Sequence, residues 1–399
     1  MKIGLFTDAY KPQISGVTTS LNMLAEGLIK EGHEVYIITV KTKGSKEFDI
    51  DKPYILRFRG IPYPRKGLEI YRFVPCVGRH VRRIKKKFPK FDVIHVHTEF
   101  SIGKLAYLYQ KRTKTPMVYT SHTMYEEYLH YVGKRLAKMF RRPFMWIVKK
   151  MLKRYVKSSQ VSIVPSKKIL DLMNKYNIEG NYKIVPTGID LEKFKKETYK
   201  EKDILKLKES LGLKDEFVCL FIGRVSSEKS IDVLLKGFKE LNNENMKFLI
   251  VGDGPYMGEL KNLIKKLDLE DKVILTGMVN WEDVGLYYQL GDCFLNASIS
   301  ETQGLTYIEA LAAGLPLLVK HDQVLEAVVT DGYNGLFFHE DDELQSLIER
   351  LKEDKKLKEE LSKNALLSVK KYSQEEYAKN ALETYEEAIK LYKEKQTNK

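Results

Sequence analysis

One stretch of the chain combines two glutamates and a glycine around the expected start of a helix. SISETQGLTYIEALAAGLP spans 298–316, with Glu301 in the loop after an apolar run and Glu309 inside the helix. The start of such a helix offers free backbone N–H groups to an anion, here those of Gln303, Gly304 and Leu305. Glu301 would then face a neutral polyol and Glu309 the vicinal hydroxyls of a ribose. The alternative is two solvated acids, one of them favoured by the helix dipole.

A second apolar run places positive charge at its carboxyl end. EFVCLFIGR (216–224) ends at Gly223 and Arg224, and Lys229 follows just before the segment 230–238. A guanidinium fork and an ammonium at one strand end suit a diphosphate. Each cation alone is more often a solvated surface charge. Together, in a half of the chain that is net acidic, they favour phosphate binding.

Two further turns carry glycine where a ligand could approach the backbone. Gly252 and Gly254 flank Asp253 at the end of another run, which serves either ligand approach or a tight strand-to-helix turn. Gly16 opens a helix expected over 16–31 and would bring backbone amides to a phosphate. No G-x-G-x-x-G occurs, which disfavours a nicotinamide or flavin cofactor.

Three of the eight histidines fall near the ends of expected strands. His95 and His97 share one face of a strand, and His122 follows the next strand. They allow a three-histidine metal site, but no carboxylate or cysteine falls at ligand spacing, so we expect no metal and interpret His122 as a contact to a substrate hydroxyl. Asp49-Ile50-Asp51 matches the D-x-D pattern of metal–nucleotide sites, yet its polar surroundings favour a loop.

The most basic segment, KRLAKMFRRPFMWIVKKMLKRYVK, spans 134–157 and holds ten Lys or Arg and no acid. Pro143 is expected to start a second helical piece. An apolar stripe at three- and four-residue steps comprises Leu136, Phe140, Phe144, Ile147, Met151 and Tyr155. This pattern is typical of a helix in a membrane interface. The alternative is a crossover helix packed on a sheet, with a basic outer face.

The absence of any acid favours an anionic membrane surface as an added partner of this segment. The basic stretch 79–90 extends the same bias. The residues expected to contact the membrane are Lys134, Arg135, Lys138, Arg141, Arg142, Trp146, Lys149, Lys150, Lys153 and Arg154.

Charge divides the chain in two. Residues 1–200 hold 41 Lys and Arg against 17 Asp and Glu, whereas residues 201–399 hold 27 against 37. An anionic partner should therefore meet the first half. A chain of 399 residues also exceeds the usual size of one hydrophobic core, which predicts two domains.

Short apolar runs alternate with helical patterns in both halves, which predicts two doubly wound parallel sheets. The runs expected to be strands are 2–6, 34–40, 54–58, 92–97, 116–121, 160–166 and 182–188, then 216–224, 246–255, 271–277, 292–298, 315–320 and 335–338. We expect no signal peptide or membrane span, and three isolated cysteines fit a reducing cytoplasm.

With these motifs together, the chain resembles the retaining GT-B glycosyltransferases of the glycogen synthase and phosphatidylinositol mannosyltransferase type. The resemblance runs through TDAYKPQISGVTTSL, DVIHVH, TSHTMYEEY, VPTGID, IGRVSSEKSIDVLLKGF, VGDGP and the two glutamates separated by seven residues. SETQGLTYIEALAAGLP, HTMYEEY and SGVTTS are most similar to bacterial diacylglycerol glucosyltransferases, which make α-glucosyl diacylglycerol from UDP-glucose.

The resemblance implies an α/β GT-B fold, with two Rossmann-like domains facing across a cleft. Residues 1–190 would be the acceptor and membrane domain, 191–373 the nucleotide-sugar donor domain, and the helix 374–394 would cross back to the first. In the first domain, it implies that Gly16 lies near the donor diphosphate and that His122 contacts the donor sugar. In the second, Arg224 and Lys229 would hold the pyrophosphate in place of a metal, Glu301 would bind the sugar and Glu309 the ribose. Further donor contacts would come from Asp253, Gln303, Gly304 and Leu305.

The implied reaction moves glucose from UDP-glucose to a membrane lipid, 1,2-diacylglycerol, on the inner face of the cell membrane and with no cofactor. Retention of configuration could use a covalent intermediate or attack on the same face, and the sequence leaves both open. One alternative is a soluble UDP-sugar-dependent glycan synthase. Another is a nucleic-acid-binding protein, which is disfavoured because the second half is acidic and no known binding module occurs.

Overall fold

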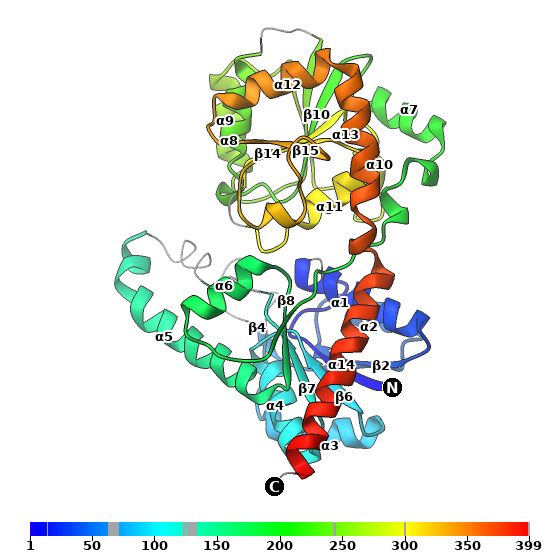
Figure 1. Cartoon of the computed structure of the whole chain (residues 1–399), viewed down its shortest axis with the longest axis vertical. Coiled ribbons are helices and arrows are strands. Elements are labelled where there is room, and N and C mark those ends of the chain that lie inside the picture. Colours follow the sequence, from blue (N-terminus) through cyan, green and yellow to red (C-terminus); the bar gives the residue numbers. More distant parts are fainter. Residues whose placement is uncertain are drawn as a thin grey trace. The chain divides into compact units, whose positions relative to one another are not determined.

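Two parallel sheets organise the chain, one in each of two units (Figure 1). The structure is a computed structural model that describes residues 1–13, 15–62, 72–122, 125, 134–241, 245–298 and 301–397, with the backbone alone for 134–141. The first unit comprises Met1–Gly188 and Gln374–Lys399, and the second comprises Ile189–Ser373.

The first unit has a seven-stranded sheet in the order β3-β2-β1-β6-β7-β8-β9, with parallel neighbours throughout. Its strands are β1 Lys2–Phe6, β2 Glu34–Val40, β3 Ile55–Phe58, β6 Val93–Val96, β7 Met117–Thr120, β8 Val161–Val164 and β9 Tyr182–Ile184, and a separate antiparallel pair joins β4 Ile61–Pro62 to β5 Arg72–Phe73. Its helices are α1 Gly16–Lys30, α2 Ser45–Phe48, α3 Val77–Lys87, α4 Ser101–Thr113, α5 Lys134–Ser158, α6 Lys167–Lys175 and α14 Gln374–Thr397.

The second unit has a six-stranded parallel sheet in the order β12-β11-β10-β13-β14-β15. Its strands are β10 Phe217–Ile222, β11 Met246–Val251, β12 Val273–Gly277, β13 Cys293–Asn296, β14 Leu317–Lys320 and β15 Gly335–Phe338. Its helices are α7 Glu201–Ser210, α8 Ile231–Lys239, α9 Met257–Lys266, α10 Val284–Tyr288, α11 Leu305–Ala312, α12 Glu343–Glu353 and α13 Lys355–Ser368, with short 3₁₀ turns η2 Glu192–Phe194, η3 Lys196–Thr198, η4 Ser227–Lys229, η5 Leu325–Ala327 and η6 Lys370–Tyr372.

The prediction of two parallel α/β sheets is confirmed, and every run expected to be a strand coincides with one. The strands are near-continuous apolar runs because helices cover both faces of each sheet. The sequence did not predict α2 or the β4–β5 pair. Both consist of elements of two to four residues, which are too short to show a periodic pattern.

In each sheet the strand order reverses at a single place. In the first unit this switch point lies between β1 and β6, and in the second between β10 and β13. Ligands of open parallel sheets bind outside the carboxyl ends of the strands at the switch point. The loops after these four strands are therefore the places to look for a site.

The last helix, α14, completes the core of the first unit although it is the end of the chain (Figure 1). Tyr377 and Tyr385 are buried in that core, and the Tyr377 hydroxyl lies 2.9 Å from the Ser20 hydroxyl of α1. At the start of α14, Gln374 accepts a hydrogen bond of 2.6 Å from the Lys30 ammonium. The final segment thus supports the sheet that begins at residue 2.

Helix α5 runs unbroken from Lys134 to Ser158, which corrects the prediction that Pro143 starts a second piece. A proline within a helix removes one backbone hydrogen bond, and here the turns on both sides remain helical. Among the described helices, none has both the length and the apolar content needed to cross a bilayer.

The buried face of α5 differs from the predicted stripe. Phe144 and Met151 pack only partly against the core, and Ile147 is 58% exposed beside Trp146, which is 62% exposed. Ile147 directly precedes the buried Val148, and one residue turns a helix by roughly 100°. The predicted stripe was therefore wrong in placing Ile147 on the buried face. Leu136 and Phe140 have side chains outside the described part. The buried face consists of Met145, Val148, Leu152, Tyr155 and Val156.

We predict that the two faces of α5 respond differently to truncation. Leu152→Ala should lower the free energy of unfolding by about 2 to 5 kcal/mol, because it opens a cavity in the core. Trp146→Ala should change it by less than about 0.5 kcal/mol, because the indole faces solvent. Urea unfolding of both variants tests this, and equal losses would contradict the assignment of the faces.

Candidate functional site

The loops after β10 and β13 bring together the charged residues predicted in the second half. The first loop contains Gly223, the exposed Arg224 and the turn η4, which ends at Lys229. The second leads from β13 past Ser298 to Glu301. Because β10 and β13 are neighbours at the switch point, both loops leave the same edge of the sheet.

Lys229 and Glu301 form an ion pair, with 2.6 Å between Nζ and Oε1. Their side chains are only 21% and 14% exposed, so water screens their attraction less than at an open surface. The Ser298 hydroxyl also donates to the backbone carbonyl of Glu228, at 3.3 Å, and so ties the two loops together. The sequence predicted both charged residues but not their contact.

Gly304 directly precedes helix α11 and has a left-handed conformation, with φ 82°. A Cβ at this position would lie 2.9 Å from the Tyr307 ring, so both the backbone angle and the packing require glycine. Gln303 and Gly304 are buried, Leu305 is half-buried, and no side chain caps the helix start. The first backbone N–H groups of α11 have no acceptor within the helix, which makes them suitable for an anion.

Glu309 is a buried carboxyl in the middle of α11, only 3% exposed. Its Oε2 accepts a hydrogen bond of 2.8 Å from the Tyr288 hydroxyl of α10. Burial raises the pKa of Glu309 to about 7, against the lowering effects of Tyr288 and of the charge on Lys193. This position does not fit the alternative of a solvated acid at the helix start. The sequence did not point to Tyr288 or Lys193 as its partners.

The VGDGP turn is explained by contact between two loops. Cβ atoms on Gly252 and Gly254 would lie 1.9 Å and 2.1 Å from the carbonyl oxygens of Gly223 and Val225. Asp253 is exposed, and its Oδ1 accepts a hydrogen bond of 2.7 Å from the Gly254 N–H. Of the two interpretations that the sequence allowed, this packing supports the tight turn.

In the first unit, Gly16 is the first residue of α1, after Ser15, whose hydroxyl accepts from the Thr18 N–H at 3.2 Å. Gly16 is exposed, and a Cβ there would meet no atom within 4 Å. Neither sterics nor a positive φ requires glycine at this place. The open approach to its backbone agrees with a role that depends on a ligand.

The three predicted histidines lie together at the carboxyl ends of β6 and β7. The rings of His95 and His97 have centroids 3.9 Å apart, and those of His97 and His122 are stacked at 5.3 Å. Burial lowers the pKa of all three, that of His122 to about 4. Both ring nitrogens of His95 bond to hydroxyls, and Nδ1 of His97 bonds to Nε2 of His122. No set of three metal-ligating side chains is found in the part of the chain that the structure describes.

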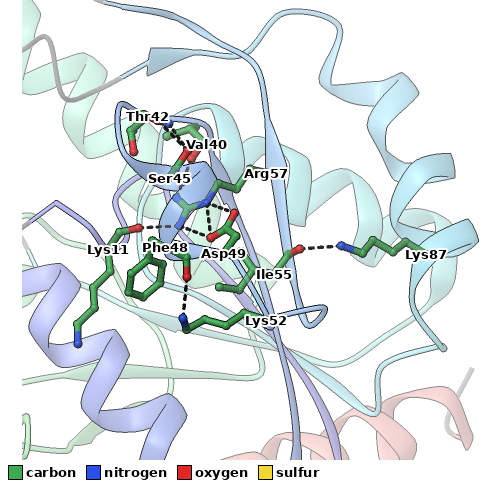
Figure 2. Close-up of polar contacts among 10 residues, drawn as sticks. All are labelled: Lys11, Val40, Thr42, Ser45, Phe48, Asp49, Lys52, Ile55, Arg57 and Lys87. Atoms are coloured by element: carbon green, nitrogen blue, oxygen red, sulfur yellow. Dashed lines mark hydrogen bonds and ion pairs between the residues drawn. The ribbon is translucent and has the colours of Figure 1, made fainter.

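The Asp49-Ile50-Asp51 segment is a turn after α2, as interpreted from the sequence. The Asp49 carboxylate accepts hydrogen bonds from Nε and Nη2 of Arg57, at 2.8 to 3.0 Å (Figure 2). Arg57 is nearly buried and also donates to the carbonyls of Lys11 and Val40. Arg57 therefore joins the edge strand β3 to the first loop, and Asp49 is occupied by its structural contact with Arg57.

Two buried acids near the first switch point were not singled out from the sequence. Asp8, after β1, accepts from the Ile102 N–H at 2.9 Å and the Thr98 hydroxyl at 2.7 Å, and burial raises its pKa to about 6. Glu99, after β6, accepts from the hydroxyls of Tyr119 and Tyr125. An acid directly after an apolar strand was the available signal for both.

The chain matches two family descriptions, Glycosyltransferase Family 4 over residues 14–193 and Glycosyl transferases group 1 over residues 203–367. It is 43% identical to the alpha-monoglucosyldiacylglycerol synthase of Acholeplasma laidlawii over 98% of both chains. The synthase of the same name from Streptococcus pneumoniae is 35% identical over 98% of this chain and 86% of that one. The structure of HepE from Anabaena with UDP-glucose has the same fold, with a TM-score of 0.74 and 19% identity over 96% of this chain and 99% of that one.

We predict a pH-dependent cost of burying Glu309. Folding raises its pKa from the usual 4.5 to about 7, so the folded state holds a proton that the unfolded state releases between these values. The free energy of unfolding should therefore fall as pH rises through this window, by up to about 3 kcal/mol. Glu309→Gln should lack this fall in urea unfolding at about pH 5 and about pH 8. Glu359→Gln, at an exposed site, should behave as the parent does, and an unchanged slope in Glu309→Gln would contradict the prediction.

Proposed function

The chain belongs to the group 1 and family 4 glycosyltransferases, and on that premise we propose that it transfers glucose from UDP-glucose to 1,2-diacylglycerol, forming α-monoglucosyldiacylglycerol. The observation that carries the donor half of this proposal is the Lys229–Glu301 pair, held at the switch point of the second sheet. The acceptor is proposed from the names of the two synthases, each of which matches 98% of this chain.

The second unit would hold the donor through contacts of complementary chemistry. Arg224 and Lys229 would bind the pyrophosphate, and the backbone N–H groups around the start of α11, at Gln303, Gly304 and Leu305, would add hydrogen bonds to it. Glu301, in the loop before α11, would bind the sugar hydroxyls. Glu309, buried on α11, would bind the ribose. Asp253 stays a sequence prediction, since its carboxylate is used within its own turn.

Catalysis would come from stabilising the leaving group. Negative charge builds on the β-phosphate as the glycosidic bond breaks, and preorganised cations lower the free energy of that state. Lys229 has three N–H donors, so it can contact a phosphate while it still holds Glu301 in place. Two cations and a helix start provide the charge stabilisation that other enzymes obtain from a metal ion.

Two groups of the first unit would complete the donor contacts. Gly16 offers backbone that a diphosphate can approach closely. His122 is neutral at physiological pH, because burial lowers its pKa to about 4, and so it can offer a directed hydrogen bond to the sugar but cannot act as a charged group.

The first unit also has the features of a membrane-binding surface. On α5, Trp146 and Ile147 are exposed, and exposed cations surround them: Arg142, Lys150, Lys153 and Arg154, with Lys149 half-buried against Tyr176. The side chains of Lys134, Arg135, Lys138 and Arg141 lie outside the described part. Elsewhere in this unit, a pocket of about 560 Å³ beside α3 is lined by three further cations, Arg79, Arg82 and Arg112. Apolar tips among cations suit the interface of an anionic bilayer, where a diacylglycerol acceptor resides.

Incubation with radiolabelled UDP-glucose and vesicles that contain a panel of lipids tests the proposal. We expect label in α-monoglucosyldiacylglycerol, and only when anionic vesicles containing diacylglycerol are present. Labelled polysaccharide formed without vesicles would instead identify a soluble glycan synthase. A nucleic-acid shift that survives competition by anionic vesicles would support the basic nucleic-acid-binding alternative.

We predict that each cation is needed for turnover and that a metal is not. Arg224→Ala and Lys229→Ala should each cost roughly 2 to 4 kcal/mol of transition-state stabilisation, measured as the loss in kcat/KM. Excess EDTA should leave most of the parent activity. Complete loss that magnesium or manganese restores would contradict this mechanism.

The two glutamates should differ in their effects. Glu301→Gln should lower kcat with nearly unchanged UDP affinity, because the proposed contact is to the sugar. Glu309→Gln should weaken UDP binding, because the neutral amide is a poorer acceptor for ribose hydroxyls. Calorimetric titration with UDP beside steady-state kinetics separates the two effects, and loss of UDP affinity in Glu301→Gln would reassign that residue.

The exposed cations of α5 should carry vesicle binding. Replacing Arg142, Lys150, Lys153 and Arg154 by Gln should abolish sedimentation with anionic vesicles, at about 1 kcal/mol per charge, and should leave UDP affinity unchanged. A matched variant with Lys239, Lys261, Lys265 and Lys266 replaced, all exposed in the second unit, loses the same charge and should still sediment. If both variants sediment like the parent, α5 is only a crossover helix.

A further inference from the structure

Three buried histidines of the first unit lie in contact, and two of them, His97 and His122, share a hydrogen bond. Nδ1 of His97 lies 3.1 Å from Nε2 of His122. The ring of His95 contacts that of His97 at a tilt of 38°, with ring centroids 3.9 Å apart. These residues come from the carboxyl ends of β6 and β7, beside the first switch point.

His95 has a partner on both sides of its ring. Its Nδ1 lies 2.7 Å from the Tyr385 hydroxyl of α14, and its Nε2 lies 2.6 Å from the Thr120 hydroxyl. A hydroxyl can donate or accept, so either tautomer of His95 is satisfied. His95 thus packs against His97 without deciding which way the hydrogen bond between His97 and His122 points.

His97 differs, because within the described part of the chain only its Nδ1 has a hydrogen-bond partner. It is 1% exposed, and its Nε2 has no hydrogen-bond partner among the residues that the structure describes. Burial keeps His97 and His122 neutral, since it lowers the pKa of both. Each neutral ring carries one N–H, so the 3.1 Å contact contains a single proton that belongs to one of the two residues.

The two possible directions leave different groups unpaired. If His122 donates, then His97 must carry its proton on Nε2, as a buried N–H with no acceptor. If His97 donates from Nδ1, its Nε2 is an unprotonated nitrogen without a donor. Buried N–H groups without an acceptor are rarer in proteins than unsatisfied acceptors, so the second direction is favoured.

We propose that His97 is a positioning residue that donates its Nδ1 proton to Nε2 of His122 and so fixes His122 as the Nδ1–H tautomer. This inference rests on the proposed function, in which His122 contacts the donor sugar. His122 then presents a hydrogen-bond donor, and the sugar atom that it contacts must be an accepting oxygen. The effect of His97 on transfer comes through His122 and not through UDP binding.

The tautomer can be read directly by NMR. In protein labelled with ¹⁵N-histidine, long-range ¹H–¹⁵N correlations distinguish protonated from bare ring nitrogens, and His122→Gln identifies the His122 signals. We expect unliganded His122 to carry its proton on Nδ1 alone. A proton on Nε2 of His122 would overturn the proposal, whatever the activity of the protein.

Two replacements of His97 test the donor. His97→Phe keeps a flat ring but no donor, so His122 should become a mixture of tautomers and kcat should fall roughly tenfold, with unchanged UDP affinity. His97→Gln restores an N–H donor and should recover part of both losses. An unchanged His122 tautomer or unchanged kcat in His97→Phe overturns the proposal, and if that variant does not fold, the parent spectrum and His97→Gln decide.

Tyr385→Phe is the matched control, because it removes a buried hydroxyl from the same cluster but leaves the His97–His122 contact. It should leave the His122 tautomer as in the parent.

The proposed function and the inference about His97 fail in different ways. If the parent transfers no glucose, the proposed function is wrong while the spectrum still reports the tautomer. If the parent transfers glucose with the opposite tautomer, only the inference about His97 is wrong.

Discussion

The structure depends on one geometric constraint, which is that parallel strands all end at the same edge of a sheet and that the strand order reverses at one point of that edge. In the second unit this constraint brings Lys229 and Glu301, which lie 72 residues apart in the chain, to within 2.6 Å. In the first unit it brings His97 next to His122. Each group of candidate site residues is thus assembled by strand order and not by proximity in sequence.

Burial then decides what these groups can do. Desolvation disfavours the charged form, so it holds Glu309 near the midpoint of its titration at neutral pH and keeps the histidines uncharged. Lys229 and Glu301 instead form an ion pair, with 2.6 Å between Nζ and Oε1. The structure therefore separates a charged pair, suited to a diphosphate and a sugar, from neutral histidines that can only direct hydrogen bonds.

Predictions from the sequence were right where the fold determines which residue types a single segment must contain. Buried parallel strands must be apolar runs, so the strands of both sheets could be predicted within a few residues. Contacts between distant residues could not, and the Lys229–Glu301 pair, the Tyr288 bond to Glu309 and the packing of Gly252 on Gly223 all belong to that class. The prediction that Ile147 is buried was wrong for another reason. The apolar residues next to it in sequence also fit a helical stripe that is shifted by one residue, so composition does not show which stripe is buried.

Helix α5 shows why its two interpretations were not exclusive. A crossover helix must bury one face, and Val148, Leu152 and Tyr155 do so. The opposite face is not packed in the core. An ordinary surface helix would carry both signs of charge and few large apolar residues on such a face. Instead this face exposes Trp146 and Ile147 among cations. Packing accounts for the first face but not for the second, and this is the observation on which the proposed contact with an anionic bilayer rests.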